Sequence, residues 1–316
     1  MIRNKRADLV LGLLVVCMLQ ACTPQAQTSV TPQPTPTPRP VCAQPELRSQ
    51  MEKAALLAQG KVGAAAVLLE GGEVVAINGA EHFPMQSVYK LPIGMYVLHQ
   101  VDRGQLTLDQ KIEVIPKDFL TGRQHSPIRD KNPKGIELSL RELLRFMVSE
   151  SDGTACDVLL GLVGGPSVVT KYLREIGLED IIVANTEREF GQDEQAQYRN
   201  WATPESALAL LRKVHEGPTL SPASRSLLLE FLTKSPTGPR RIKGMLPQGT
   251  QVAHKTGSSG RLNDYTRALN DIGIITLPDD RHLALAVFVS DSKVDEQTLE
   301  GVIATIARST WDCWIK

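Results

Sequence analysis

The sequence predicts an α+β fold in which an antiparallel sheet is built from both ends of the folded region and an all-helical region is inserted between them. Two observations support this prediction. Strand patterns occur at residues 62–77 and return only at residues 251–289, and the patterns between them are helical. A cleft between the sheet and the inserted helices is the natural place for a site.

Residues 1–21 read as an export signal. Basic residues precede an apolar run from Leu9 to Leu19, which is too short to span a bilayer stably. Residues 22–41 are rich in Pro, Thr and Gln, so we expect an extended linker that packs no core. The folded domain is expected at residues 42–316.

The first folded elements follow from periodicity. A helix is expected from Pro45 to about Gln59, because its apolar residues recur at helical spacing. Two strands follow, Val62 to Leu69 and Val74 to Ile77, and Gly71-Gly72 between them is a hairpin signal.

Helices dominate the middle of the chain. One is expected after Ser87, and another starts at Ser139, whose spacing to Glu142 forms a capping box. Further helices are expected from Ala155 to Val163 and from Thr203-Pro204, where proline takes the first helical position.

Strand patterns return near the C-terminus. They cover Gln251 to Lys255, Ile272 to Leu277 and Leu283 to Val289, and a closing helix follows around Val302 to Trp311. Pairing of these strands with those of residues 62–77 gives the single predicted sheet.

Composition narrows the class of partner. The formal net charge is zero and no long basic run occurs, so no nucleic-acid partner is expected. The six histidines show no metal-ligand spacing, and no Gly-x-Ser-x-Gly occurs. A metal hydrolase and an α/β-hydrolase are therefore disfavoured, no metal or cofactor is expected, and nothing suggests more than a monomer.

Three of the five cysteines remain in the folded domain. Cys156 lies on an apolar helix face, where a buried free thiol is expected. Cys42 and Cys313 lie at its two ends and can pair if the terminal helices pack together.

Ser87 and Lys90 are the first candidates for chemistry. A Ser in the first turn of a helix and a Lys three residues later lie on one face, so the ammonium group can lie beside the hydroxyl. The helix start adds unpaired N–H groups that suit an oxyanion. The structural alternative is that Ser87 caps the helix and Lys90 is solvated.

Three more groups have both a chemical and a structural interpretation. Ser151-Asp152-Gly153 lies in a turn between two helices, where Ser151 can project into a cleft or the turn can simply cap a helix. Lys255-Thr256-Gly257 ends a strand, so Lys255 points into the cleft or is an ordinary edge-strand lysine. Glu187 lies in a polar loop, where most carboxylates are merely solvated.

Together these residues resemble the class A serine β-lactamases, whose signature is Ser-x-x-Lys, Ser-Asp-Asn and Lys-Thr-Gly. The family shares its fold with D-Ala-D-Ala transpeptidases. The resemblance covers about Leu47 to Trp314. The stretches Gln197 to Trp201 and Thr237 to Gly244 look most like the PER-type extended-spectrum members.

The resemblance implies a reaction through an acyl-enzyme. Ser87 attacks the carbonyl group of a β-lactam antibiotic, and either Lys90 or Glu187 acting through a water removes its proton. Ser151 relays a proton to the lactam nitrogen, and Glu187 activates the water that hydrolyses the acyl-enzyme. The backbone N–H groups of Ser87 and Ser258 form the oxyanion hole.

The resemblance also implies a binding site for the substrate carboxylate. Lys255, Thr256 and Ser258 hold this group, and Gly257 lets the ligand approach the backbone. Arg241 is the candidate for an assisting guanidinium, because its fork suits a carboxylate.

Several positions depart from the family pattern. Gly153 replaces an Asn that binds the substrate's acylamino group, which puts affinity and substrate range in doubt. Gly191 replaces an Asn that helps hold the hydrolytic water, so deacylation is expected to be slower or differently arranged. Asn185 and Asn200 replace an Arg–Asp pair, which predicts an altered loop.

Two further points concern the site. Gln86 and Ser259 exclude the active-site disulfide of some carbapenem-hydrolysing members. Glu189 is the rival for the role of Glu187, and the spacing to Trp201 and Pro204 favours Glu187.

The resemblance extends to the N-terminus, where Leu19-Gln20-Ala21-Cys22 is similar to a bacterial lipobox. It implies lipidation of Cys22 and a membrane-tethered periplasmic protein, with plain secretion as the alternative. Two other functions remain open: a D,D-peptidase or penicillin-binding protein, which lacks a deacylating Glu in this loop, and a lipoprotein that binds β-lactams without hydrolysing them.

Overall fold

The structure is a computed structural model that describes residues 43–122 and 124–315. The predicted signal and linker, with Cys22, lie outside the described residues. No single described helix is long and apolar enough to cross a bilayer. The pair α5 (Gly153–Leu162) and α6 (Pro166–Glu175), bent by 72°, meets that test only by length and composition.

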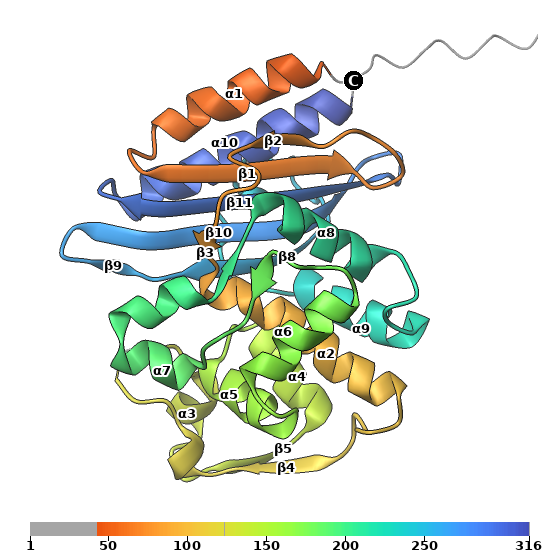
Figure 1. The fold of residues 1–316 in the computed structure, drawn as a ribbon, viewed down its shortest axis with the longest axis vertical. Coiled ribbons are helices and arrows are strands. Elements are labelled where there is room, and N and C mark those ends of the chain that lie inside the picture. Colours follow the sequence, from red (N-terminus) through yellow and green to blue (C-terminus); the bar gives the residue numbers. More distant parts are fainter. Residues whose placement is uncertain (1–42, 123, 316) are drawn as a thin grey trace, which may run out of the picture. The chain divides into compact units, whose positions relative to one another are not determined.

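A six-stranded antiparallel sheet joins the two ends of the domain (Figure 1). Its strands are β1 (Lys61–Leu68), β2 (Val75–Ile77), β8 (Val252–Ser258), β9 (Arg261–Leu262), β10 (Tyr265–Thr276) and β11 (His282–Ser292). The order is β2-β1-β11-β10-β8, with β9 paired to β10. β1 pairs with β11 along its length, so the predicted sheet from both termini and the α+β class are confirmed.

The central strands are buried on both faces because their side chains alternate between two apolar clusters. In β11, Ala284, Ala286 and Phe288 pack toward the inserted helices, whereas Leu285 and Val287 pack toward the terminal helices. The terminal helices are α1 (Gln44–Leu56) and α10 (Glu296–Trp314). They lie together over one face of the sheet (Figure 1).

The inserted region contains the other helices and two small sheets. The helices are α2 (Lys90–Asp102), α3 (Pro127–Lys131), α4 (Leu140–Val148), α5, α6, α7 (Glu187–Gln192), α8 (Pro204–His215) and α9 (Pro222–Thr233), with 3₁₀ turns η1 (Gln86–Tyr89), η2 (Pro116–Asp118), η3 (Glu194–Arg199) and η4 (Ile242–Met245). The small sheets pair β3 (Phe83–Pro84) with β7 (Trp201–Ala202) and β7 with β6 (Ile181–Ile182), and β4 (Lys111–Val114) with β5 (Ile136–Ser139).

Capping chemistry places the predicted helix starts correctly. The backbone N–H of Ser139 donates to Glu142 Oε2 at 2.7 Å, and the N–H of Glu142 donates to Ser139 Oγ at 3.2 Å, so the predicted capping box is present. Pro204 is the first residue of α8, as predicted, and Thr203 is its N-cap.

Several elements differ from the sequence prediction. Helices α6 and α9 were not predicted, although each begins with a proline, Pro166 and Pro222, at its first position. Strand β10 starts at Tyr265, seven residues earlier than expected. The polar Asn270 and Asp271 interrupt its apolar pattern, but both are fully buried and hydrogen-bonded.

The cysteines agree with the sequence where the structure describes them. Cys156 is free and buried, as predicted. Helix α1 packs on α10, which carries Cys313, and Cys313 is disulfide-bonded. Because Cys42 lies outside the described residues, its pairing with Cys313 stays a prediction.

Candidate active site

Ser87 lies in the 3₁₀ turn η1, and Lys90 is the first residue of α2. Lys90 Nζ lies 3.0 Å from Ser87 Oγ, and Lys90 is only 1% exposed. No side chain caps the start of η1 or the start of α2 by a hydrogen bond. The alternative of a capping serine beside a solvated lysine is therefore wrong.

The turn that carries Ser87 has a strained backbone. Gln86 has φ = 47°, a left-handed conformation that costs a non-glycine residue about 1–3 kcal/mol. Tertiary contacts hold it: Gln86 Nε2 donates to Gln197 Oε1 at 2.6 Å, and Asn270 Nδ2 donates to the carbonyls of Pro84 and Met85. Asn270 was not among the predicted site residues, although polar residues between the apolar residues of a strand were a usable signal.

The Lys90 ammonium group joins three parts of the site. Besides Ser87 Oγ, it contacts the carbonyl of Ser151 at 2.8 Å and Glu187 Oε1 at 2.7 Å. Burial by itself favours the neutral amine, but the Glu187 carboxylate outweighs it and raises the pKa of Lys90. A charged Lys90–Glu187 pair thus lies directly beside Ser87.

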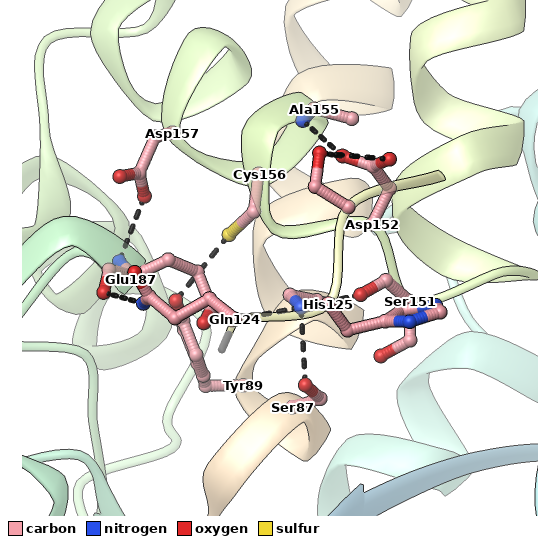
Figure 2. A network of polar contacts seen from close by, with 12 residues as sticks. Ser87, Tyr89, Gln124, His125, Ser151, Asp152, Ala155, Cys156, Asp157 and Glu187 are labelled. Atoms are coloured by element: carbon pink, nitrogen blue, oxygen red, sulfur yellow. Dashed lines mark hydrogen bonds and ion pairs between the residues drawn. The ribbon is translucent and has the colours of Figure 1, made fainter. Parts of the chain in front are cut away.

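Ser151 links this pair to the sheet. It has φ = 61°, its carbonyl accepts from Lys90, and its Oγ accepts from Lys255 Nζ at 2.9 Å. The neighbouring Asp152 caps α5 by accepting from the N–H of Ala155 at 2.8 Å. The helix-cap interpretation is thus correct for Asp152, whereas Ser151 contacts both buried lysines and its role with substrate stays a prediction. Figure 2 shows Ser87, Ser151 and Glu187 brought together from η1, from the turn between α4 and α5, and from α7.

Lys255 is fully buried although β8 is an edge strand of the sheet. Its Nζ donates to Ser151 Oγ and, at 3.0 Å, to the carbonyl of Thr256. Burial, together with the nearby Lys90 charge, lowers the pKa of Lys255 well below its usual range. The hydroxyl of Thr256 lies 2.7 Å from that of Thr237. The interpretation of Lys255 as a solvated edge residue is wrong.

Gly257 lets β8 pass against the nucleophile turn. A Cβ atom at this position would lie 2.4 Å from the carbonyl oxygen of Met85 and 3.3 Å from the Ser87 nitrogen. Only glycine permits this approach. β8 therefore lies directly against the backbone of Ser87, and the oxyanion hole expected from the amides of Ser87 and Ser258 stays a prediction.

Arg241 lies beside the same strand. Its Nη1 donates to the carbonyls of Gly257 and Asn270, both at 3.1 Å, and only 7% of its side chain is exposed. Glu296 and Glu300 lie 3.5 and 3.6 Å from its guanidinium. Arg241 therefore supports the Lys255 strand, and its contact with substrate stays a prediction.

Glu187 is the first residue of helix α7, which corrects the expected irregular loop. Thr186 caps this helix, and Glu189 Oε2 accepts from the Thr186 N–H at 2.7 Å, so Glu189 completes a capping box. Its carboxylate is therefore directed to the helix start, whereas Glu187 contacts Lys90. The geometry favours Glu187 over Glu189, and the Thr-x-x-Glu spacing was the signal for the helix.

Asp157 positions the start of α7. It was not among the site residues predicted from the sequence. Its carboxylate accepts from the N–H groups of Glu187 at 2.8 Å and Arg188 at 2.9 Å (Figure 2 shows the Glu187 contact). Burial outweighs these hydrogen bonds and raises the pKa of Asp157 to about 6. Its partners come from a segment 30 residues later, so no local pattern identifies it.

An asparagine side chain joins the two ends of the segment that carries α7. Asn200 Oδ1 accepts from the N–H groups of Ala184 at 2.7 Å and Asn185 at 2.8 Å, and its Nδ2 donates to the carbonyl of Asn185 at 3.0 Å. Hydrogen bonds from the Asn200 side chain to the backbone thus close this segment, in place of the charged pair that the family has at these positions.

Neighbouring side chains fill the space beside Gly153 and Gly191, the two glycines that differ from the family pattern. A Cβ atom on Gly153 would lie 2.4 Å from Leu120 Cδ1 and 3.4 Å from Glu187 Cγ. A Cβ atom on Gly191 would lie 2.6 Å from Gln124 Oε1, and Gln124 Nε2 donates to the carbonyl of Glu187. The side chains of Leu120 and Gln124 are thus adapted to glycine at these positions.

We predict that Gly153→Asn destabilises the protein, because the new side chain must displace Leu120. Overpacking of this kind costs about 1–3 kcal/mol, which corresponds to a fall of several degrees in Tm. Gly161→Asn in the same helix is the control, since nothing lies within 4 Å of a Cβ atom there. Equal Tm values for the two variants, measured by calorimetry, would contradict the predicted crowding.

Comparison with known proteins shows which family has a similar sequence. The model of the β-lactamase enzyme family matches residues 46–314. Extended-spectrum β-lactamase PER-1 of Pseudomonas aeruginosa is 40% identical over 274 residues, covering 86% of this chain and 88% of that protein. β-Lactamase VEB-1 of the same species is 39% identical over 257 residues, covering 81% and 86%.

Solved structures of β-lactamases have the same fold as this chain. The TLA-1 extended-spectrum β-lactamase superposes with a TM-score of 0.84 at 40% identity, covering 86% of this chain and 99% of that chain. A β-lactamase from Chitinophaga pinensis DSM 2588 has a TM-score of 0.82 at 46% identity, covering 84% and 98%.

Proposed function

The chain belongs to the class A serine β-lactamases and hydrolyses β-lactams, and from this premise we propose that Ser87 is the nucleophile and Glu187 the base that releases the acyl-enzyme. The observation that carries the proposal is the Lys90 ammonium group, 3.0 Å from Ser87 Oγ and 2.7 Å from Glu187 Oε1. It couples the nucleophile to a carboxylate.

In the acylation step, Ser87 Oγ bonds to the lactam carbonyl carbon and the ring C–N bond breaks. The Ser87 proton passes to the Lys90–Glu187 pair, and the Ser151 hydroxyl gives its own proton to the departing nitrogen. The pair then passes a proton on to Ser151 Oγ, so that Ser151 is again a hydroxyl and Glu187 again a carboxylate before deacylation. Two contacts support this route: Lys255 Nζ holds Ser151 Oγ at 2.9 Å, and Lys90 holds the Ser151 carbonyl at 2.8 Å. Amides of Ser87 and Ser258 stabilise the oxyanion.

In the deacylation step, Glu187 takes a proton from the water that attacks the ester carbon. The bond from that carbon to Ser87 Oγ breaks, and the proton passes from Glu187 through Lys90 to Ser87 Oγ, which restores the hydroxyl. Asp157 supports this role by fixing the backbone of Glu187 at the start of α7. A D,D-peptidase, or a lipoprotein that stays acylated, has no need of a carboxylate placed here. The Glu187 contact with Lys90 therefore favours a β-lactamase over both alternatives.

We expect Arg241→Ala to raise KM about 10- to 150-fold for carboxylate-bearing penicillins and to change kcat less, because a charged hydrogen bond contributes about 1.5–3 kcal/mol. Arg240→Ala is the control, since Arg240 pairs with Glu300 while 71% of its side chain is exposed. Steady-state kinetics of both variants test the expectation. An unchanged KM for Arg241→Ala would remove this residue from substrate binding.

The substrate range is proposed to include penicillins, cephalosporins and oxyimino-cephalosporins, because the relatives PER-1 and TLA-1 are named extended-spectrum enzymes. The test is the intact mass of the protein, followed over time after mixing with a penicillin and with an oxyimino-cephalosporin. A transient adduct with many turnovers supports the proposal. A stable adduct would instead indicate a penicillin-binding protein or a β-lactam sensor.

The cellular location is also a proposal. The export pattern of residues 1–21 and the lipobox-like sequence that ends at Cys22 support a lipoprotein, tethered in the periplasm by residues 22–41. Membrane fractionation tests it: Cys22→Ser should move the protein from the membrane to the soluble fraction. Equal partitioning of both forms would argue against the lipid anchor.

A further inference from the structure

Three potential metal ligands meet outside the active site. Glu70 follows the end of β1, His215 is the last residue of α8, and His282 is the first residue of β11. One ligand atom from each lies within 4.8 Å of the other two. The trio is the one group of three such ligands found within residues 43–122 and 124–315. Sequence spacing could not reveal it, because the three residues come from distant segments.

The trio is held in place by contacts around it. The backbone N–H of His282 donates to both carboxylate oxygens of Glu70, at 3.0 and 2.9 Å. Arg212, one turn before His215 in α8, donates from Nη1 to the carbonyl of Leu69 at 3.1 Å. The end of α8 is thereby fixed to the residue next to Glu70.

A simple ion pair does not account for all three residues. Glu70 Oε1 and His282 Nδ1 lie 2.7 Å apart and are sufficient for such a pair. His215 comes from a third element, and its ring centroid lies 4.2 Å from that of His282. Two imidazoles and a carboxylate in contact form a typical ligand set for zinc.

The distances suit a tetrahedral ion. Zinc bonds to N and O of about 2.1 Å place neighbouring ligand atoms about 3.4 Å apart. The observed separations lie between a 2.7 Å contact and a 4.8 Å limit, so small side-chain movements can accommodate the ion. His215 and His282 also line a cavity of about 460 Å³, which leaves room for a water as fourth ligand.

We propose that Glu70, His215 and His282 bind one Zn²⁺ ion that ties the end of β1, the end of α8 and the start of β11 together. An ion that binds only the folded state stabilises it. The site is therefore a stabilising one, separate from the chemistry at Ser87.

The test uses untagged, EDTA-treated enzyme titrated with ZnCl₂, with bound metal measured by equilibrium dialysis and elemental analysis. We expect one Zn²⁺ per chain and a Tm rise of about 5 °C or more at a free zinc concentration near 100 times Kd. MgCl₂ should produce neither effect, because Mg²⁺ prefers oxygen ligands.

Matched variants locate the ion. His215→Gln and Glu70→Gln should weaken zinc binding at least tenfold and remove the Tm rise. Glu230→Gln is the control, since Glu230 lines the same cavity but pairs with Lys234 at 2.6 Å. Hydrolysis of a penicillin at the wild-type rate shows that each variant is folded. Absence of zinc binding to the wild-type enzyme, or binding that His215→Gln and Glu70→Gln leave unchanged, would overturn the proposal.

Discussion

Ser87→Ala is expected to abolish covalent labelling by a penicillin and to lower kcat by about 10⁴- to 10⁶-fold. The Ser87 hydroxyl is the group that Lys90 Nζ contacts at 3.0 Å, and alanine has no atom that can form the ester. Intact-mass analysis measures the adduct, and steady-state kinetics measure the residual turnover.

The matched control is Ser259→Ala. Ser259 follows the Lys255 strand, and its Oγ donates to the carbonyl of Gly260, so its loss should leave labelling intact. The Tm of Ser87→Ala should stay near that of the wild type, because the strained turn is held by Gln86 and Asn270 rather than by the serine. Labelling that persists in Ser87→Ala would place the nucleophile elsewhere.

Local patterns predict much of the fold because they report local energetics. The capping box at Ser139 and the proline start at Pro204 appear as expected, since each satisfies backbone groups within its own helix. The full length of β10 could not be predicted in this way. Asn270 and Asp271 look like strand breakers in the sequence and are tolerated only because distant groups bond to them.

In the active site, too, some features follow from local sequence and others depend on the folded chain. Spacing brings Ser87 and Lys90 together on one turn, but the partners that shape their chemistry come from other elements. The left-handed backbone of Ser151 and the Asp157 contacts with α7 exist only in the folded chain. So does the packing of Leu120 against Gly153, which explains how this chain accommodates glycine where the family signature has Asn.

Glu187→Gln is expected to retain labelling of Ser87 and to slow release of the acyl group by about 10²- to 10⁴-fold, the usual contribution of a general base. A glutamine amide cannot take the proton of the attacking water. It also removes the negative charge that raises the pKa of Lys90 against burial. Loss of this charge lowers the pKa of Lys90 and makes its amine a better acceptor for the Ser87 proton, so acylation continues while deacylation slows.

The expected signature is a burst of one equivalent of product followed by a stable adduct in the intact mass. Glu189→Gln is the matched control, because its carboxylate accepts from the Thr186 N–H and does not contact Lys90. Its loss should lower stability by about 1 kcal/mol through the weakened cap and leave turnover near that of the wild type. Normal turnover in Glu187→Gln together with an accumulating adduct in Glu189→Gln would exchange the two roles. The Lys90 ion pair would then be structural, and the water would be activated from the helix start.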